Sequence, residues 1–374
     1  MKLNELIVLS ANKGLELQNE NGSFPKGNNG PWHDKDTYVR TTAHWAILEN
    51  YAFKLTGNEE FETCALKACD YLLIEECRPQ GYSFFCRENK RKDKCNGLIG
   101  QAWALEALIE IGGVDPNRRK YLDYAVEAIG CFTYDYRKHM WKTTEVNGKK
   151  GLKCRTLNQQ IWFSVMVLIA GELTNNRDLI EVALDYFDNM SIHIKTAESG
   201  LIGHFNKQNK MIEILYNSRK VLYERIFKRR HFDNFEMTLS IGYLSFILYG
   251  LSILYARSSS YEFWQTDKMK GLIQNAYNYV EKNKPYFCGD DGNNYVWGYN
   301  PVGIEIAYTI QSFGTYLGSN IYEDSIQYWL VLQMQNYYDL EEGMMSKNTI
   351  DEIILAARFY EAARLKNIDI DFSN

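Results

Sequence analysis

Two kinds of helical segment alternate along this sequence, with one pair in roughly 55 residues. Six segments are apolar on most faces, as is typical of helices inside a large core: Tyr38–Thr56, Gly97–Ile111, Thr156–Thr174, Phe235–Ala256, Pro301–Leu317 and Ile350–Leu365. Between them lie more charged, amphipathic segments: Glu59–Glu76, Asn117–Thr133, Arg177–Lys195, Asp267–Lys282 and Ile321–Tyr338. The alternation predicts a ring of helical hairpins, each with one apolar helix inside and one amphipathic helix outside.

The two ends of the chain supply the last hairpin. Lys2–Gln18 forms a sixth outer helix, which would pack beside the last inner helix. Proline, which costs about 3 kcal/mol in a helix interior, occurs only 6 times in 374 residues, and no Pro-rich or Ser/Gly-rich linker divides the chain. We therefore predict an all-α fold, an (α/α)6 toroid in which residues 1–374 form a single domain of six helical hairpins and the N-terminal helix closes the ring.

The charge balance gives the chain no general attraction to nucleic acid. Lys and Arg number 42 against 47 Asp and Glu, which leaves a formal net charge of −5. A basic stretch, residues 219–231, departs from this balance, and it either binds phosphate or an anionic polymer or forms a solvated helix face. We expect no nucleic-acid partner.

Membrane, cofactor and metal signals are missing from the sequence. No apolar run approaches the roughly 18 residues of a membrane span, and the N-terminal run is too short for a signal peptide, so we expect no membrane span and a cytoplasmic location. The 8 cysteines are dilute, no CxxC pair occurs, and no two histidines have the i, i+4 spacing of a helical metal site. P-loop, GxGxxG, HExxH and GxSxG motifs are also missing, so we expect no metal and no cofactor. The oligomeric state stays open.

Polar and aromatic residues collect in the loop before the first inner helix. In a helical toroid, the loops that enter the inner helices meet at one mouth, so functional groups are expected there. This loop and the first helical turns carry Trp32, His33, Asp34, Asp36, Arg40 and His44. Arg40 and His44 are four residues apart and share one helix face. Asp34 and Asp36 either cap the helix that starts near Tyr38 or provide acid/base function.

The other inner helices begin with similar groups. Amide and indole groups suit a sugar site because sugars offer hydroxyls for hydrogen bonds and C–H faces for stacking. The second and third inner helices carry Asn96, Gln101, Trp103, Asn158, Gln159 and Trp162, and the alternative is that the asparagines are N-caps and the tryptophans belong to the core. The fifth loop and the last inner helix add Trp297, Tyr299, Asn300, Glu305 and Arg358. Glu305 is either a general acid/base or a structural partner of an arginine such as Arg358.

Five stretches of the sequence, spread over nearly the whole chain, resemble one protein family. They are residues 28–45, 96–108, 157–163, 300–308 and 357–361. The chain resembles the AglQ-like family of archaeal N-glycosylation clusters and bacterial capsule or surface-glycan clusters, which is similar to the (α/α)6 unsaturated glucuronyl hydrolases. Asn96 stands where the best-known hydrolases of that kind have an aspartate.

The resemblance implies a carbohydrate-active enzyme, a glycoside hydrolase acting on uronic-acid-containing surface-glycan or capsule oligosaccharides. It assigns carboxylate acid/base catalysis to Asp34, Asp36 and Glu305, and carboxylate binding to Arg40, Arg155 or Arg358. The predicted substrate-binding set is Trp32, His33, Arg40, His44, Asn96, Gln101, Trp103, Arg155, Asn158, Gln159, Trp162, His204, Trp297, Tyr299, Asn300 and Arg358.

Three alternatives remain on the same toroid. A sugar epimerase or isomerase would need two bases on opposite faces of the sugar, for which His44 and His204 are the candidates. A polysaccharide lyase is the second alternative, and a non-catalytic glycan-binding protein is the third. The expected partner in every case is an oligosaccharide, either anionic or neutral.

Overall fold

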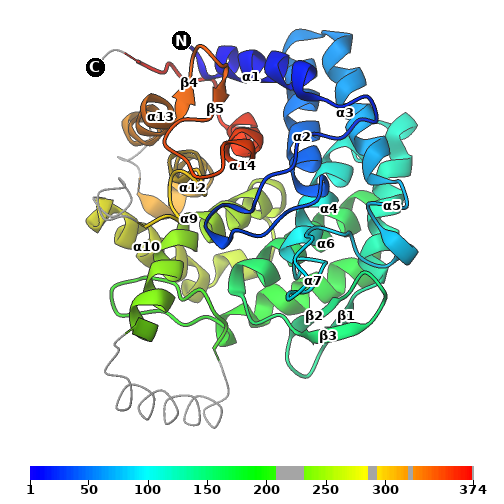
Figure 1. Ribbon diagram of the computed structural model, residues 1–374. Coiled ribbons are helices and arrows are strands. Elements are labelled where there is room, and N and C mark those ends of the chain that lie inside the picture. Colours follow the sequence, from blue (N-terminus) through cyan, green and yellow to red (C-terminus); the bar gives the residue numbers. More distant parts are fainter. Residues whose placement is uncertain (208–230, 285–292, 319–322, 373–374) are drawn as a thin grey trace.

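The computed structural model describes residues 1–207, 231–284, 293–318 and 323–372, and these residues form a ring of helices (Figure 1). The inner helices are α2 (Val39–Thr56), α4 (Ile99–Gly112), α6 (Leu157–Thr174), α9 (His231–Ser258), α12 (Val302–Leu317) and α14 (Glu352–Ala357). The outer helices are α1 (Leu3–Leu17), α3 (Glu59–Leu72), α5 (Arg119–Gly130), α7 (Arg177–Asn189), α10 (Asp267–Lys282) and α13 (Glu323–Tyr337). The predicted all-α (α/α)6 toroid is confirmed.

The inner helices follow one another around the ring and close it. Each contacts the next, from α2 through α4, α6, α9 and α12 to the last inner segment, which packs back against α2. Outer helix α1 lies against both α2 and this last segment. The chain termini meet beside it, where the Met1 amino group donates to the carbonyl of Ile370 at 3.0 Å.

The last inner segment is not α-helical throughout. After α14 the chain tightens into the 3₁₀ helix η6 (Arg358–Arg364). Arg358 begins this segment at the end of the ring where the inner helices start, and Arg364 finishes it at the opposite end. The described connections contain five short 3₁₀ helices: η1 (Gly30–Trp32), η2 (Pro79–Gly81), η3 (Pro116–Arg118), η4 (Met190–Ile192) and η5 (Glu262–Gln265).

Two small antiparallel sheets lie in the loops that the structure describes, and they were not predicted. One joins β1 (Thr133–Asp135), β2 (Met140–Thr144) and β3 (Lys150–Lys153), and the other joins β4 (Tyr338–Asp339) and β5 (Met344–Met345). Trp141 fixes the first sheet to the ring, because its backbone N–H and carbonyl both bond the side chain of Gln160 on α6, at 3.0 and 2.9 Å. The predicted outer helix 117–133 therefore ends at Gly130.

Helix α9 corrects the expectation that no apolar run is long enough to cross a membrane. An 18-residue window of its segment Phe235–Ser258 has a mean hydropathy of 1.7, but 89% of the residues in this window are buried inside the ring. The apolar residues of α9 therefore pack against α6 and α12 as an inner helix. Most of the basic stretch 219–231 lies outside the described residues.

Candidate active site

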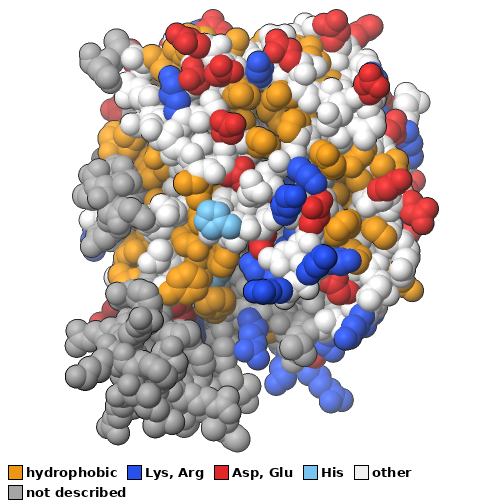
Figure 2. Space-filling view, in the orientation of Figure 1, with side chains coloured by type: hydrophobic (Ala, Val, Ile, Leu, Met, Phe, Trp, Pro, Cys, Tyr) orange, Lys and Arg blue, Asp and Glu red, His pale blue; other side chains and the backbone are white. Residues whose placement is uncertain are grey.

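A cavity of about 350 Å³ opens at the end of the ring where the inner helices begin. On the same face of the molecule the loop before α2 crosses the ring, and Lys and Arg side chains gather beside it (Figures 1 and 2). Its wall combines aromatic rings, amides and charged groups: Asn29, Trp32, Asp34, Arg40, Arg87, Lys92, Asn96, Ile99, Trp103, Thr156, Asn158, Gln159, His204, Phe205, Phe235, Leu239, Tyr243, Phe246, Tyr299, Asn300 and Arg358. Among the described wall residues, four are cationic and only Asp34 is a carboxylate.

The loop before α2 reaches the cavity in a strained backbone conformation. Asn29 and Gly30 have φ angles of 56° and 53°, in the left-handed region. Only glycine fits at position 30, because a Cβ there would lie 2.2 Å from the ring of Tyr299. Asp351, which caps α14, holds this turn by accepting from the backbone N–H groups of Asn28 and Gly30 at 2.8 and 2.9 Å. The last inner helix thus fixes the first loop.

Arg40 lies in the cavity wall with few negative charges around it. Its guanidinium lies over the ring of Trp103, 4.0 Å from the centroid, and donates to the neutral side-chain oxygen of Asn29 at 2.9 Å. Asn29 also accepts from the Tyr299 hydroxyl at 2.8 Å. The nearest carboxylate is Asp36, at 3.7 Å. The arginine is therefore held by neutral groups, which leaves its charge available to an anion.

Asp36 lies behind the wall and neither lines the cavity nor caps a helix. Its carboxyl oxygens are buried with no hydrogen-bond partner among the described residues. Burial raises its pKa to about 7, against the opposing charge of Arg40. The N-terminus of α2 has no side-chain cap in the described structure, so the alternative that Asp34 or Asp36 caps this helix is wrong.

The Asp36→Asn variant should therefore gain stability relative to the wild type as pH rises. Because the folded protein holds the Asp36 proton up to about pH 7 while an unfolded aspartate loses it near pH 4, wild-type stability from this group is lost as pH rises through that window. Urea unfolding at pH 5 and pH 8 measures the effect, with the exposed Asp123→Asn as control. An Asp36→Asn difference that stays constant between the two pH values would show that Asp36 is ionised throughout.

Asp34 is the carboxylate of the wall and is surrounded by donors. It accepts from Asn89 at 2.6 Å and from Lys92 at 2.7 Å, and Arg87 lies 3.4 Å away. Burial would raise its pKa, but the hydrogen bonds from Lys92 and Asn89 and the charges of Lys92 and Arg87 outweigh burial and lower it. Asp34 is therefore ionised at neutral pH, the state required of a general base or nucleophile.

Arg358 reaches the cavity from the last inner segment and is tied to two buried glutamates. It donates to Glu305 at 2.6 Å and to Glu361 at 2.7 Å. It also donates to the Tyr299 carbonyl at 3.0 Å and to the side chain of Asn300. Glu305 is fully buried and does not line the cavity, so its structural role as the partner of Arg358 is the one that the geometry favours.

His204, Trp32 and Tyr243 form another part of the cavity wall. The indole N–H of Trp32 donates to the Tyr243 hydroxyl at 2.7 Å, and the His204 ring lies 4.7 Å from the Tyr243 ring. Burial lowers the pKa of His204 to about 4, so this imidazole is neutral at pH 7. Its Nδ1 has no hydrogen-bond partner among the described residues.

Six predicted binding residues do not line this cavity. His33 and Arg155 are exposed on the loops. His44 lies one turn below Arg40, stacked 4.6 Å from Tyr360, and both of its ring nitrogens are buried without partners in the described structure. The other three are structural: Gln101 bonds the backbone of Phe84 and Cys95, Trp162 donates to the Phe246 carbonyl, and Trp297 stacks on Trp329 and Tyr337.

The predicted asparagines do line the cavity, and neither caps its helix. The described N-terminal turns of α4 and α6 have no side-chain cap. Asn96 adopts a φ of 54°, while the Asn158 side chain accepts from the backbone of Gln159. Gln159 in turn accepts from the backbone N–H of Leu98 at 3.0 Å, which joins the starts of α4 and α6.

Sequence reasoning missed five polar groups in the described wall: Asn29, Arg87, Lys92, Thr156 and Tyr243. A signal was available for two of them. Arg87 and Lys92 belong to a charged stretch directly before the second inner helix, where the loops of a toroid gather at the mouth. Tyr243 lies inside the apolar α9 and has no local sequence signal.

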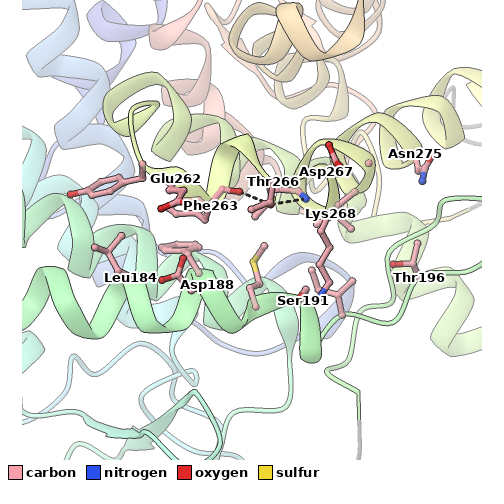
Figure 3. Close-up of a pocket in the computed structure, with 17 residues that line it drawn as sticks. Leu184, Asp188, Ser191, Thr196, Glu262, Phe263, Thr266, Asp267, Lys268 and Asn275 are labelled. Atoms are coloured by element: carbon pink, nitrogen blue, oxygen red, sulfur yellow. Dashed lines mark hydrogen bonds between the residues drawn. The ribbon is translucent and has the colours of Figure 1, made fainter.

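Two other features do not resemble this cavity. A hollow of about 800 Å³ lies on the outside of the ring between α7 and α10, with an apolar floor and with Asp188, Glu262 and Asp267 in its wall, and it contains none of the predicted residues (Figure 3). The one group of possible metal ligands among the described residues is Asp93, Cys95 and Glu145. Burial raises the pKa of the Cys95 thiol, which disfavours the thiolate that binds metals.

Comparison with known proteins identifies the family. No known family profile matches the chain. The chain is 31% identical to archaeal glycosylation protein Q of Haloferax volcanii, over 98% of each sequence. It belongs to the archaeal glycosylation protein Q family. The resemblance seen in the sequence motifs is thus confirmed for the whole chain.

Solved structures with the same fold share little sequence with this family member. Cellobiose 2-epimerase from Bacillus thermoamylovorans has a TM-score of 0.64 at 12% identity and covers 96% of this chain and 98% of its own. An α-1,6-mannanase of Salegentibacter sp. has a TM-score of 0.57 at 11% identity, with the same coverage. An unsaturated glucuronyl hydrolase specific for heparin has a TM-score of 0.54 at 10% identity, covering 96% and 94%. These similarities confirm the toroid.

Proposed function

We propose that the chain is a carbohydrate-active enzyme that binds a uronic-acid-containing oligosaccharide in the cavity and hydrolyses a glycosidic bond there. The charge of the wall carries the proposal. Among the described wall residues Arg40, Arg87, Lys92 and Arg358 are cations and Asp34 is the one carboxylate, and aromatic rings stand beside them. Arg358 is compensated behind the wall by Glu305 and Glu361, whereas Arg40 has only the long contact to Asp36. Guanidinium groups bind carboxylates bidentately, and indole and phenol rings stack on sugar C–H faces. The membership in a glycosylation-protein family and the folds of the mannanase, epimerase and glucuronyl hydrolase support a glycan substrate.

The residues then take different parts in binding and reaction. Arg40 holds the sugar carboxylate over Trp103, because its hydrogen bond goes to the neutral Asn29 and its ion pair with Asp36 is long, at 3.7 Å. Trp32 and Tyr299 flank the sugar ring. Asp34 is the reacting carboxylate, ionised and placed in the wall. Asp36 and Glu305, first predicted as its catalytic partners, lie behind the wall as positioning residues for Arg40 and Arg358.

Epimerisation by two histidines does not fit the described wall. Of His44 and His204, only His204 reaches the cavity. Incubation with oligosaccharides that end in a uronic acid tests the reaction: new reducing ends indicate hydrolysis. Exchange of a sugar proton with solvent without bond cleavage would indicate epimerisation, and an unsaturated product would indicate a lyase. Saturable binding with no chemical change would indicate a glycan-binding protein.

The Arg40→Gln change should weaken binding of the anionic glycan selectively. It is made in the Asp36→Asn background, so that no buried carboxylate is left without its cation. Loss of a charge-assisted hydrogen bond of about 1.5–3 kcal/mol corresponds to a Kd about ten- to a hundredfold higher. Calorimetric titration with a uronic-acid oligosaccharide and with its neutral counterpart measures this. Equal losses for both ligands would show that Arg40 shapes the cavity without binding the carboxylate.

A further inference from the structure

A second cavity, of about 400 Å³, occupies the opposite end of the ring, where the inner helices finish. Its wall is lined by Ile47, Asn50, Tyr51, Lys54, Glu110, Ile253, Arg257, Tyr308, Ala363 and Arg364. These residues come from α2, α4, α9, α12 and η6, and none of them lines the first cavity. Buried residues between the two, among them Tyr249, Tyr360 and Glu106, separate them.

The wall of this second cavity has an excess of positive charge. Lys54, Arg257 and Arg364 face one carboxylate, Glu110. Glu110 is shared between Arg364 at 3.3 Å and Arg257 at 3.6 Å, and the charges of these arginines lower its pKa despite burial. Arg364 also donates to Glu106, which lies behind it at 2.9 Å, so Arg364 is compensated.

Lys54 and Arg257 keep most of their charge for a ligand. In the described structure the Lys54 ammonium has no ion pair or hydrogen bond, and it stands at the exposed end of α2. Arg257, in the last turn of α9, has only the long contact to Glu110 and a side chain that is 36% exposed. The apolar and aromatic groups Ile47, Tyr51, Ile253 and Tyr308 line the same space.

We propose that this second cavity binds a phosphate group, with Lys54 and Arg257 as its charged donors and Tyr51 and Tyr308 beside them. A phosphate carries nearly two negative charges at neutral pH, which compensates the two cations that the protein leaves without a close partner. The volume of the cavity, about 400 Å³, and the apolar and aromatic groups in its wall suit an organic phosphate. Cations in the last turn also stabilise helix C-termini, and this simpler role predicts no ligand at all.

Titration of the full chain with inorganic phosphate and with glucose 6-phosphate tests the proposal, by calorimetry and by the shift in melting temperature. Saturable binding is expected for the wild type. Lys54→Gln and Arg257→Gln should each weaken it about tenfold, as the loss of one charge-assisted hydrogen bond predicts. Lys120→Gln, an exposed cation of α5, is the matched control and should bind as the wild type does. Tighter binding of glucose 6-phosphate than of inorganic phosphate would identify an organic phosphate as the ligand, and equal binding would identify free phosphate.

The Lys92→Gln variant changes the wall of the first cavity, so it distinguishes phosphate binding in the second cavity from phosphate binding in the first. Phosphate binding that is lost in Lys92→Gln but kept in Arg257→Gln would overturn the proposal, as would a wild type with no saturable binding. If Lys54 and Arg257 only stabilise the ends of their helices, each variant would melt at a lower temperature than the wild type, by the same amount with and without phosphate. That result would also overturn the proposal. Circular dichroism of each variant without ligand confirms that both substitutions, at exposed side chains, leave the fold intact.

Discussion

Replacing Asp34 by asparagine should reduce turnover of a uronic-acid oligosaccharide by about 10²–10⁴-fold, the contribution of one positioned acid/base group. Asp34 is the carboxylate of the described cavity wall, and its lowered pKa keeps it ionised at neutral pH. An asparagine keeps the size of the side chain and can still accept a hydrogen bond from Asn89 or Lys92. Binding of the glycan should therefore change less than turnover does, which kcat and KM measured together would show.

The fold should tolerate this change. Lys92 is 38% exposed and can turn toward water, while Arg87 keeps its bond to Asp93 at 2.6 Å. We expect the free energy of unfolding to fall by no more than about 1 kcal/mol, the cost of losing an ordinary hydrogen bond. Urea unfolding of the variant checks this value.

Asp93→Asn is the matched control, because Asp93 binds the same Arg87 without lining the cavity. It should keep most of the activity. If Asp93→Asn and Asp34→Asn lose activity equally, the shared effect is on the position of Arg87, and Asp34 is an anchor for the cations of the wall. Activity above a tenth of the wild-type value in Asp34→Asn would lead to the same conclusion.

The repeat of apolar and amphipathic helices was enough to predict the ring, because helix periodicity is a local property of the sequence. Every predicted inner and outer helix is present, with ends that shift by a few residues, as between 117–133 and Arg119–Gly130. The small sheet of residues 133–153 was not predictable in the same way. Its strands are short, and contacts with Gln160 and Ser164 on α6, which are distant in the sequence, hold Trp141 in place.

The candidate site was predictable to the level of the helical turn. Residues at the start of each inner helix, such as Arg40, Trp103 and Asn158, reach the cavity. Predicted residues that lie one turn deeper, such as His44 and Trp162, are buried in the layer below, because a change of three or four residues along an inner helix moves a side chain by about 5 Å along the ring axis. Sequence spacing shows that two residues share a helix face, but not how far into the ring the mouth extends.

Replacing Arg358 by methionine should destabilise the fold by about 3–5 kcal/mol, the cost of breaking a buried ion pair from one side. Arg358 is 2% exposed, and its loss leaves Glu305 and Glu361, both fully buried, without their cation. One carboxylate oxygen of each already has no hydrogen-bond partner among the described residues. Burial raises the pKa of both carboxyls, and Arg358 opposes this rise. Urea unfolding at neutral pH measures the loss.

The charges, rather than the packing of Arg358, should cause most of this loss. The triple variant Arg358→Met, Glu305→Gln, Glu361→Gln removes all three charges and should recover more than half of the lost stability, because buried ion pairs replaced as a set are often close to neutral in cost. The same reasoning predicts that Arg358→Met alone recovers stability toward acidic pH, where the two glutamates are protonated. A loss below about 1 kcal/mol in Arg358→Met, or a triple variant no more stable than the single one, would show that Arg358 is held in the wall by packing on Phe246. In that case its charge would be as available to the sugar carboxylate as that of Arg40.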